Sequence, residues 1–204
     1  MHSWYLTNRK GGSTHDHLHT KTNHPSNTDE GSATVLLAGP IRGGGDWQHQ
    51  MALELMLQCA EAHIACPSRW TAEHPLAEYF VQPFSRAENR QLVWERHYME
   101  QAAIGDYERG ETTPGCLIFW LPLESESDPH PGPEPYAMDT RRELGKFTAL
   151  YGWAGARVVL GGDRQFYGLD VILNEFADVA GTDTFPFYET MSELAEAALS
   201  ESRP

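Results

Sequence analysis

The apolar stretch Cys116-Leu-Ile-Phe-Trp-Leu-Pro122 decides the fold class of this chain. A continuous apolar run of this length is typical of a β-strand that is buried on both faces. A proline-rich loop follows, and Tyr136-Ala-Met-Asp-Thr-Arg-Arg-Glu-Leu-Gly145 then opens a helix that we predict from Asp139 to Tyr151. A buried strand followed by a helix is the repeating unit of an α/β fold with a parallel sheet.

The same alternation of strand and helix runs through the chain from Ala33. Short apolar runs bounded by Gly or Pro predict four further strands, and periodic apolar positions with capping residues predict four further helices. The strands are predicted at Thr34–Ala38, Ile64–Cys66, Arg157–Leu160 and Thr184–Phe187, and the helices at Trp47–His63, Ser85–Ile104, Gly168–Phe176 and Thr190–Ser200. We therefore predict an α/β fold whose parallel sheet has about five strands, with helices on both faces.

Length and composition fit one domain and exclude several kinds of partner. The 204 residues carry a formal net charge of −14, which argues against a nucleic acid or an anionic membrane surface as partner. Residues 1–32, with histidines at 15, 17, 19 and 24, contain no signal peptide or membrane anchor, so we expect a flexible polar tail before a single domain at 33–204. The spacing of Cys59, Cys66 and Cys116 predicts no metal site and no disulfide, which indicates reduced thiols in a cytoplasmic protein.

Glu143 is the first candidate for chemistry. It lies about one turn into the predicted helix, just past the C-terminal end of a central strand, where open α/β sheets place their sites. A helix N-terminus favours an ionised carboxylate, which suits a nucleophile. Asp139 lies four residues earlier on the same face, so the two carboxylates can divide the roles of nucleophile and proton carrier. The alternative is an ordinary acidic helix start, balanced by Arg141, Arg142 and Lys146.

A glycine-rich turn, Gly39-Pro-Ile-Arg-Gly-Gly-Gly-Asp-Trp47, joins the first strand to the first helix. Its glycines permit a ligand to approach backbone N–H groups, and a helix N-terminus favours an anion. The turn is neither a GxGxxG fingerprint nor a P-loop, so no NAD, ATP or other cofactor is predicted. Trp47 either stacks on a base or packs in the core. Trp94 and Glu95 are further candidates, with a core aromatic and a solvated helix pair with Arg96 as the alternative.

Several segments occur in an order that resembles the nucleoside 2-deoxyribosyltransferase family and its N-glycosidase relatives. These segments are Leu37-Ala-Gly-Pro-Ile41, Cys66-Pro-Ser-Arg69, the helix with Trp94-Glu95, Leu117-Ile-Phe-Trp-Leu-Pro122 and Thr140-Arg-Arg-Glu-Leu-Gly145. The resemblance covers about residues 35–176. It implies a flavodoxin-like Rossmann-type fold, cleavage of the bond between a base and a 2-deoxyribose, and a homodimer or higher homo-oligomer.

In that family the glutamate of Thr-x-x-Glu-Leu-Gly attacks the anomeric carbon, and this position is Glu143 here. An ionised carboxylate stabilises an oxocarbenium-like state and then traps the sugar, while a second acid protonates the departing base. The resemblance implies further roles: Gly39, Pro40 and Ile41 shape the sugar and base pocket, Trp47 flanks the base, and Asp139 orients sugar hydroxyls or assists proton transfer.

Two features depart from the family pattern. Ala137 stands where the family often has an aspartate six residues before the nucleophile, which leaves the proton donor open. The acidic loop Leu123–Pro135 is longer than the typical connection. Three functions therefore stay open: transfer of the sugar to another base, hydrolysis of nucleoside 5′-monophosphates with Arg42 and glycines 43–45 holding the phosphate, and nucleotide binding without catalysis.

Overall fold

A computed structural model describes residues 2–6, 34–60, 62–68, 87–105 and 115–202. Within residues 2–6 and 87–94 it describes the backbone and not the side chains. The histidine cluster of the N-terminal tail lies outside these residues.

Five strands form a parallel sheet, as the sequence predicts. They are β2 (Thr34–Ala38), β3 (His63–Ser68), β4 (Gly115–Leu121), β5 (Val158–Gly162) and β6 (Phe187–Tyr188). Their order across the sheet is β3-β2-β4-β5-β6, and every neighbouring pair is parallel. Numbered among themselves, the strands have the order 2-1-3-4-5 of flavodoxin-like sheets. The α/β fold predicted from the sequence is confirmed.

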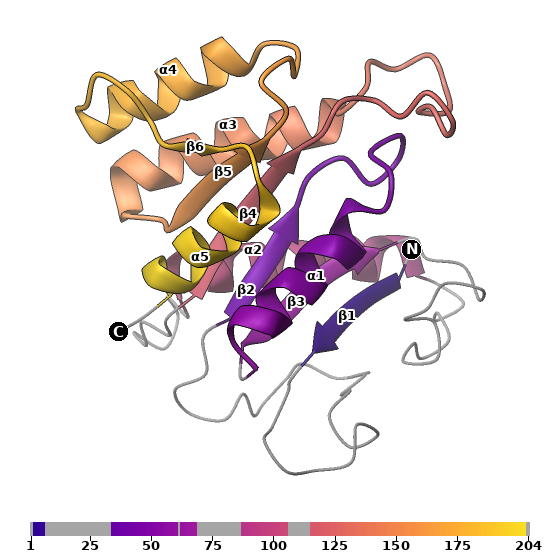
Figure 1. Ribbon diagram of the computed structural model, residues 1–204, viewed down its shortest axis with the longest axis horizontal. Coiled ribbons are helices and arrows are strands. Elements are labelled where there is room, and N and C mark those ends of the chain that lie inside the picture. Colours follow the sequence, from indigo (N-terminus) through magenta and orange to yellow (C-terminus); the bar gives the residue numbers. More distant parts are fainter. Residues whose placement is uncertain (1, 7–33, 61, 69–86, 106–114, 203–204) are drawn as a thin grey trace.

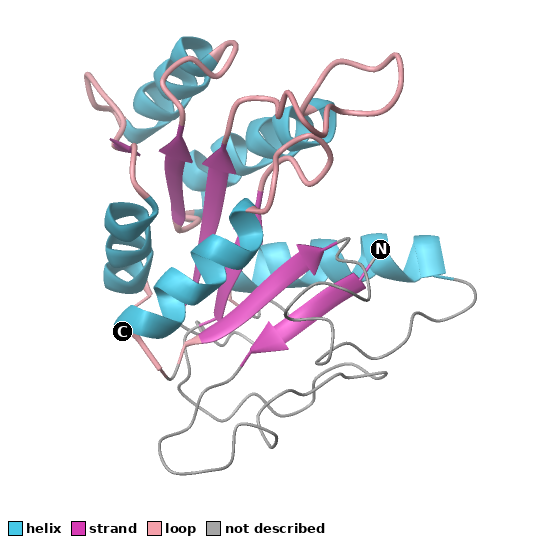
Figure 2. Ribbon diagram, turned by 45° about the vertical axis from the view of Figure 1, so that its right-hand side comes forward, coloured by secondary structure: helices cyan, strands magenta, loops and turns pink. Residues whose placement is uncertain are grey.

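A sixth strand, β1 (His2–Leu6), extends the sheet within the segment that we expected to be a flexible tail. It pairs antiparallel with β3, from His2 opposite Ser68 to Leu6 opposite Ile64, and Figure 2 shows the two arrows side by side in opposite directions. The predicted boundary at residue 33 misses this strand, because five residues beside a polar tail give too short a pattern to recognise. Residues 7–33, between β1 and β2, lie outside the described chain.

Helices cover both faces of the sheet (Figure 1). One face packs against α2 (Ala87–Ile104), α3 (Met138–Ala154) and α4 (Leu169–Ala180), and the other against α1 (Trp47–Gln58) and α5 (Met191–Glu201). The two faces follow from the alternation of side chains along each strand. In β4, Phe119 points to the α2, α3 and α4 face, and Ile118 points to the α1 and α5 face.

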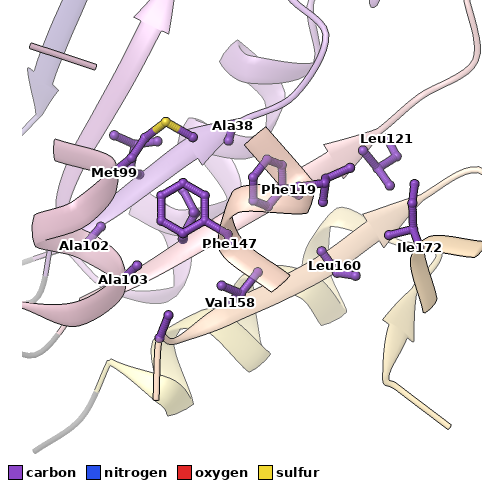
Figure 3. Close-up of a cluster of buried hydrophobic side chains, with 14 of the residues drawn as sticks. Ala38, Met99, Ala102, Ala103, Phe119, Leu121, Phe147, Val158, Leu160 and Ile172 are labelled. Carbon is purple, nitrogen blue, oxygen red and sulfur yellow. The ribbon is translucent and has the colours of Figure 1, made fainter. Parts of the chain in front are cut away.

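The core on the α2, α3 and α4 face is centred on two phenylalanines. Phe119 of β4 and Phe147 of α3 are fully buried, with their ring centroids 6.2 Å apart, and Met99 of α2 lies in the same cluster (Figure 3). Burying one such side chain contributes about 2–3 kcal/mol. This packing fixes α3 on the sheet, and α3 carries Glu143.

Several element boundaries differ from those predicted. The first helix ends at Gln58, five residues before the predicted end, because Cys59 adopts an extended conformation. The strand that we predicted to stop before Pro67 continues to Ser68. Pro67 lies beyond Ala65, the last residue of β3 that pairs with β2, so the missing N–H of the proline removes no hydrogen bond between these two strands. The predicted cap of the last helix is confirmed, with the Thr190 hydroxyl accepting from the Glu193 N–H at 3.3 Å. None of the helices in the described ranges is both long and apolar enough to cross a bilayer.

Candidate active site at the carboxyl end of the sheet

Two connections that the sequence singles out meet at the carboxyl end of the parallel strands. The turn after β2 and the loop after β4 lie side by side (Figure 1), and the Ser125 N–H donates to the Gly43 carbonyl at 2.7 Å. β2 and β4 are neighbours in the sheet, so their carboxyl ends lie next to each other. This is the edge at which open α/β sheets bind their ligands.

Gly39 and Pro40 make close contacts with other parts of the chain. Gly39 has a φ of 149°, and a Cβ there would lie 2.3 Å from the Trp120 carbonyl oxygen and 2.8 Å from the Trp47 ring. Trp47 is 3% exposed and donates from Nε1 to the Pro40 carbonyl at 2.7 Å. Of the two interpretations of Trp47, the structure therefore supports the packing aromatic. A ring that is buried in this way is not available to flank a base.

The rest of the turn is divided between a covered part and an open part. Gly43 is buried against the loop after β4, where a Cβ would lie 2.8 Å from the His130 nitrogen. Gly45 is open, since a Cβ there would meet nothing within 4 Å. Arg42 is exposed and Ile41 is half-buried. Asp46 holds the expected N-cap position of α1 without making the side-chain capping bond.

Glu143 is half-buried on α3, and its environment favours the protonated form. Burial, which is the largest cause, and the carboxylates of Glu95 and Asp139 raise its pKa to about 7, against the opposite effect of Arg142 and Lys146. The expectation that the helix start holds Glu143 ionised is therefore wrong. Glu143 is the sixth residue of α3, beyond the free N–H groups of the first turn, so burial outweighs the dipole.

For Glu95 of α2, the sequence left open a site residue or an ordinary solvated pair with Arg96, and the structure brings it near Glu143. It is close enough to Glu143 to raise its pKa, so α2 and α3 together bring two carboxyl groups to one place. The two helices are also joined by an ion pair, in which the Lys146 amine lies 2.7 Å from the Glu100 carboxylate. Trp94 lies in the part of α2 whose side chains are not described.

Asp139 differs from Glu143 in exposure. Its side chain is 84% exposed and lies 3.7 Å from the Arg142 guanidinium. It shares a helix face with Glu143, as predicted, and contributes a negative charge to the environment of Glu143. The two acidic residues of α3 therefore stand in contrasting surroundings, one wet and one largely withdrawn from water.

Ala137 occupies the N-cap of α3 in a left-handed conformation, with φ 61° and ψ 24°. It is 8% exposed and belongs to the apolar cluster on the α3 face of the sheet. A methyl group packed in this way has no proton to supply. Among the residues that the structure describes, Glu95 and Asp139 are the acids that act on Glu143.

The sequence reasoning missed an aromatic and arginine cluster that ties the loops of this edge together. The Arg141 guanidinium lies 4.6 Å from the Phe166 ring centroid and donates to the Tyr167 carbonyl at 2.6 Å. The Tyr136 hydroxyl donates to the Pro122 carbonyl at 3.0 Å, and its ring packs edge-on against Phe166. Arg141 was interpreted as a balancing charge, because sequence spacing along α3 cannot indicate contacts with the loop after β5.

In the described ranges, no group of three or more His, Cys, Asp or Glu side chains is placed to hold a metal ion. Cys66 and Cys116 are buried free thiols whose pKa values are raised by burial, and Cys59 is a partly exposed free thiol.

Comparisons with protein-family models, with curated proteins and with solved structures found no match to this chain. The family resemblance of the sequence therefore remains a prediction.

Proposed function

We propose that this protein cleaves the N-glycosidic bond of 2-deoxynucleosides and transfers the sugar to another base, with Glu143 as the nucleophile. The observation that supports this most is the placement of Glu143. It is a largely buried carboxyl group, beside Glu95, on the helix that follows the central strand. Strongly perturbed carboxyl groups at the ligand-binding edge of an α/β sheet are typical of catalytic sites.

In the proposed reaction the ionised Glu143 carboxylate attacks the anomeric carbon of the sugar. The bond from that carbon to the base nitrogen breaks, and the base leaves with the bonding electrons while a second acid supplies its proton. An ester between Glu143 and the sugar remains. A second base then attacks the anomeric carbon and returns its N–H proton to the second acid, the ester bond breaks, and the carboxylate of Glu143 is restored.

Glu95 and Asp139 are the two proposed proton donors. Glu95 has the stronger claim, because it is half-buried and close enough to Glu143 to raise the pKa of that carboxyl group. Asp139 is exposed, which suits contact with sugar hydroxyls.

The raised pKa of Glu143 also favours a second candidate function, a hydrolase. A carboxyl group with a pKa of about 7 is matched to general acid or base work at neutral pH. In that alternative, Glu143 protonates the leaving base, water attacks the sugar, and no ester forms.

A base-release assay tests the proposed function. Deoxynucleosides are incubated with the protein, with and without a second base, and the released base and new nucleosides are quantified by chromatography. Glu143→Ala abolishes base release if the proposal is right, whereas the control Glu175→Ala, which removes an exposed carboxylate from α4, leaves it within a few-fold of wild type. Equal base release by wild type and Glu143→Ala would refute the assignment.

The intact mass of the protein distinguishes a nucleophilic Glu143 from a Glu143 that acts as general acid. A 2-fluoro-2-deoxyarabinosyl nucleoside slows the breakdown of a sugar ester, because the fluorine destabilises the oxocarbenium-like state. A mass increase of one sugar unit that maps to Glu143 supports the nucleophile. Base release without any adduct supports the hydrolase in which Glu143 is the general acid.

A further inference from the structure

The loop between β4 and α3, residues 122–135, covers part of the turn that a phosphate would approach. Its Ser125 N–H donates to the Gly43 carbonyl at 2.7 Å, and its His130 backbone fills the space beside the Gly43 Cα. Figure 1 shows the loop beside the β2–α1 turn at the carboxyl end of the sheet. A glycine turn before a helix is a common anion site because its N–H groups face the ligand, and here the loop already occupies the Gly43 carbonyl and the space beside the Gly43 Cα.

Hydrogen bonds within the loop hold it in this position. The Glu124 carboxylate accepts from the His130 N–H at 2.7 Å, and the Asp128 N–H donates to the Ser125 hydroxyl at 3.2 Å. At the end of the loop, the Tyr136 hydroxyl donates to the Pro122 carbonyl at 3.0 Å. The loop is therefore fixed at both ends and at its contact with Gly43.

The charge of the loop opposes an anion at the same place. Residues 122–135 contain four carboxylates, at positions 124, 126, 128 and 134, and no Lys or Arg. All four side chains are exposed. The turn at residues 39–46 supplies one cation, Arg42, and one further carboxylate, Asp46. A dianionic 5′-phosphate that reached Arg42 would stand in a net negative field.

We propose that the 122–135 loop excludes 5′-phosphorylated substrates, so that the site takes unphosphorylated nucleosides. This inference rests on the proposed N-glycosidic activity and decides between its nucleoside and nucleotide forms. The loop acts in two ways: it covers Gly43, and its carboxylates repel the phosphate. Uncharged nucleosides meet neither obstacle.

The test reverses two charges of the loop. In Glu126→Lys with Asp128→Lys, kcat/KM for a deoxynucleoside 5′-monophosphate rises on the order of 50-fold at about 10 mM ionic strength and about 5-fold at 0.15 M, for charges about 10 Å from the phosphate. The rate with the unphosphorylated nucleoside stays within twofold. The matched control, Glu175→Lys with Asp178→Lys on the exposed side of α4, changes the net charge equally and gives less than a twofold gain.

A second variant tests the cover itself. Ser125→Pro removes the N–H that donates to the Gly43 carbonyl, and the rate with the monophosphate rises relative to the rate with the nucleoside. In wild type, the nucleoside is preferred over its monophosphate by at least tenfold. A wild-type protein that uses the monophosphate as well as the nucleoside, or loop variants that leave the ratio unchanged, would overturn the proposal while the N-glycosidic activity stands.

A titration with inorganic phosphate tests the loop without turnover. Wild type shows no phosphate binding by calorimetry in the millimolar range, whereas Glu126→Lys with Asp128→Lys gains binding that is lost on adding Arg42→Ala. Wild-type binding that Arg42→Ala removes would contradict the exclusion. If neither nucleosides nor monophosphates are cleaved, the proposed function fails, and this titration still decides whether the loop keeps phosphate out.

Discussion

Replacing Glu143 by glutamine should make the protein more stable at alkaline pH while removing its activity. Glu143 is half-buried and sits near two other carboxylates, so its ionised form is unfavourable in the folded protein. Glutamine has nearly the same shape and no charge. The substitution therefore removes an electrostatic penalty and leaves the packing of α3 almost unchanged.

The size of the effect follows from the pKa of Glu143. The pKa rises from an ordinary value of 4.5 to about 7 on folding, a difference that corresponds to about 3 kcal/mol. Below pH 4.5 the carboxyl group is protonated in both states and contributes nothing. Between pH 4.5 and 7 the folded state holds a proton that the unfolded state has lost, so stability falls as pH rises. Above pH 7 the full penalty is present, and Glu143→Gln removes it.

The assay is chemical denaturation of wild type and Glu143→Gln at pH 4.5, 6 and 8. The free energy of unfolding of the variant exceeds that of wild type by up to about 3 kcal/mol at pH 8, by an intermediate amount at pH 6, and by almost nothing at pH 4.5. The difference between the two proteins cancels the titration of the histidines, which both share. A variant that is less stable than wild type at pH 8, or a difference that does not change with pH, would refute the reasoning.

Three further changes test the remaining contacts. Glu95→Gln removes the preferred proton donor and lowers base release, and because it also lowers the pKa of Glu143, the acid limb of the pH profile of the remaining activity shifts to lower pH. Gly39→Ala places a methyl group 2.3 Å from the backbone of β4 and destabilises by about 3 kcal/mol or more, whereas Gly45→Ala meets nothing and costs about 1 kcal/mol for its positive φ, as measured by urea denaturation. Thr190→Ala removes the cap of α5 and costs about 1 kcal/mol in the same assay.

The parallel core of the fold could be predicted because its signals are local. A buried strand such as β4 is a continuous apolar run, and the helices between strands show periodic apolar positions and capping residues. The edges carry weaker signals. β6 has two residues, and its predicted edge position next to Pro186 is confirmed. β1 pairs with a strand more than 55 residues away in the sequence, and no local pattern indicates such a partner.

The sequence predicts the place of Glu143 in the fold but not the electrostatic environment of its carboxyl group. Position along a helix follows from sequence spacing, which places Glu143 after the central strand on the same face as Asp139. The pKa depends on which side chains approach from other elements, and Glu95 belongs to a helix about 50 residues earlier in the sequence. Trp47 shows the same limit, because the sequence cannot tell whether an aromatic ring at a turn points to a ligand or to the core.

Burial of Glu143 against Glu95 is difficult to explain by stability alone. An apolar or amide side chain at position 143 would keep the contacts of α3 without the penalty of an ionised carboxylate, which is about 3 kcal/mol above pH 7. Asp139, four residues earlier, shows that an acidic side chain on this face can remain exposed to water. A carboxylate that destabilises its own fold at neutral pH is retained where chemistry requires it, since catalytic sites are often locally destabilising. We therefore predict the stability gain in Glu143→Gln and its loss of base release as two consequences of one arrangement, and measuring both on one variant tests whether the burial serves catalysis.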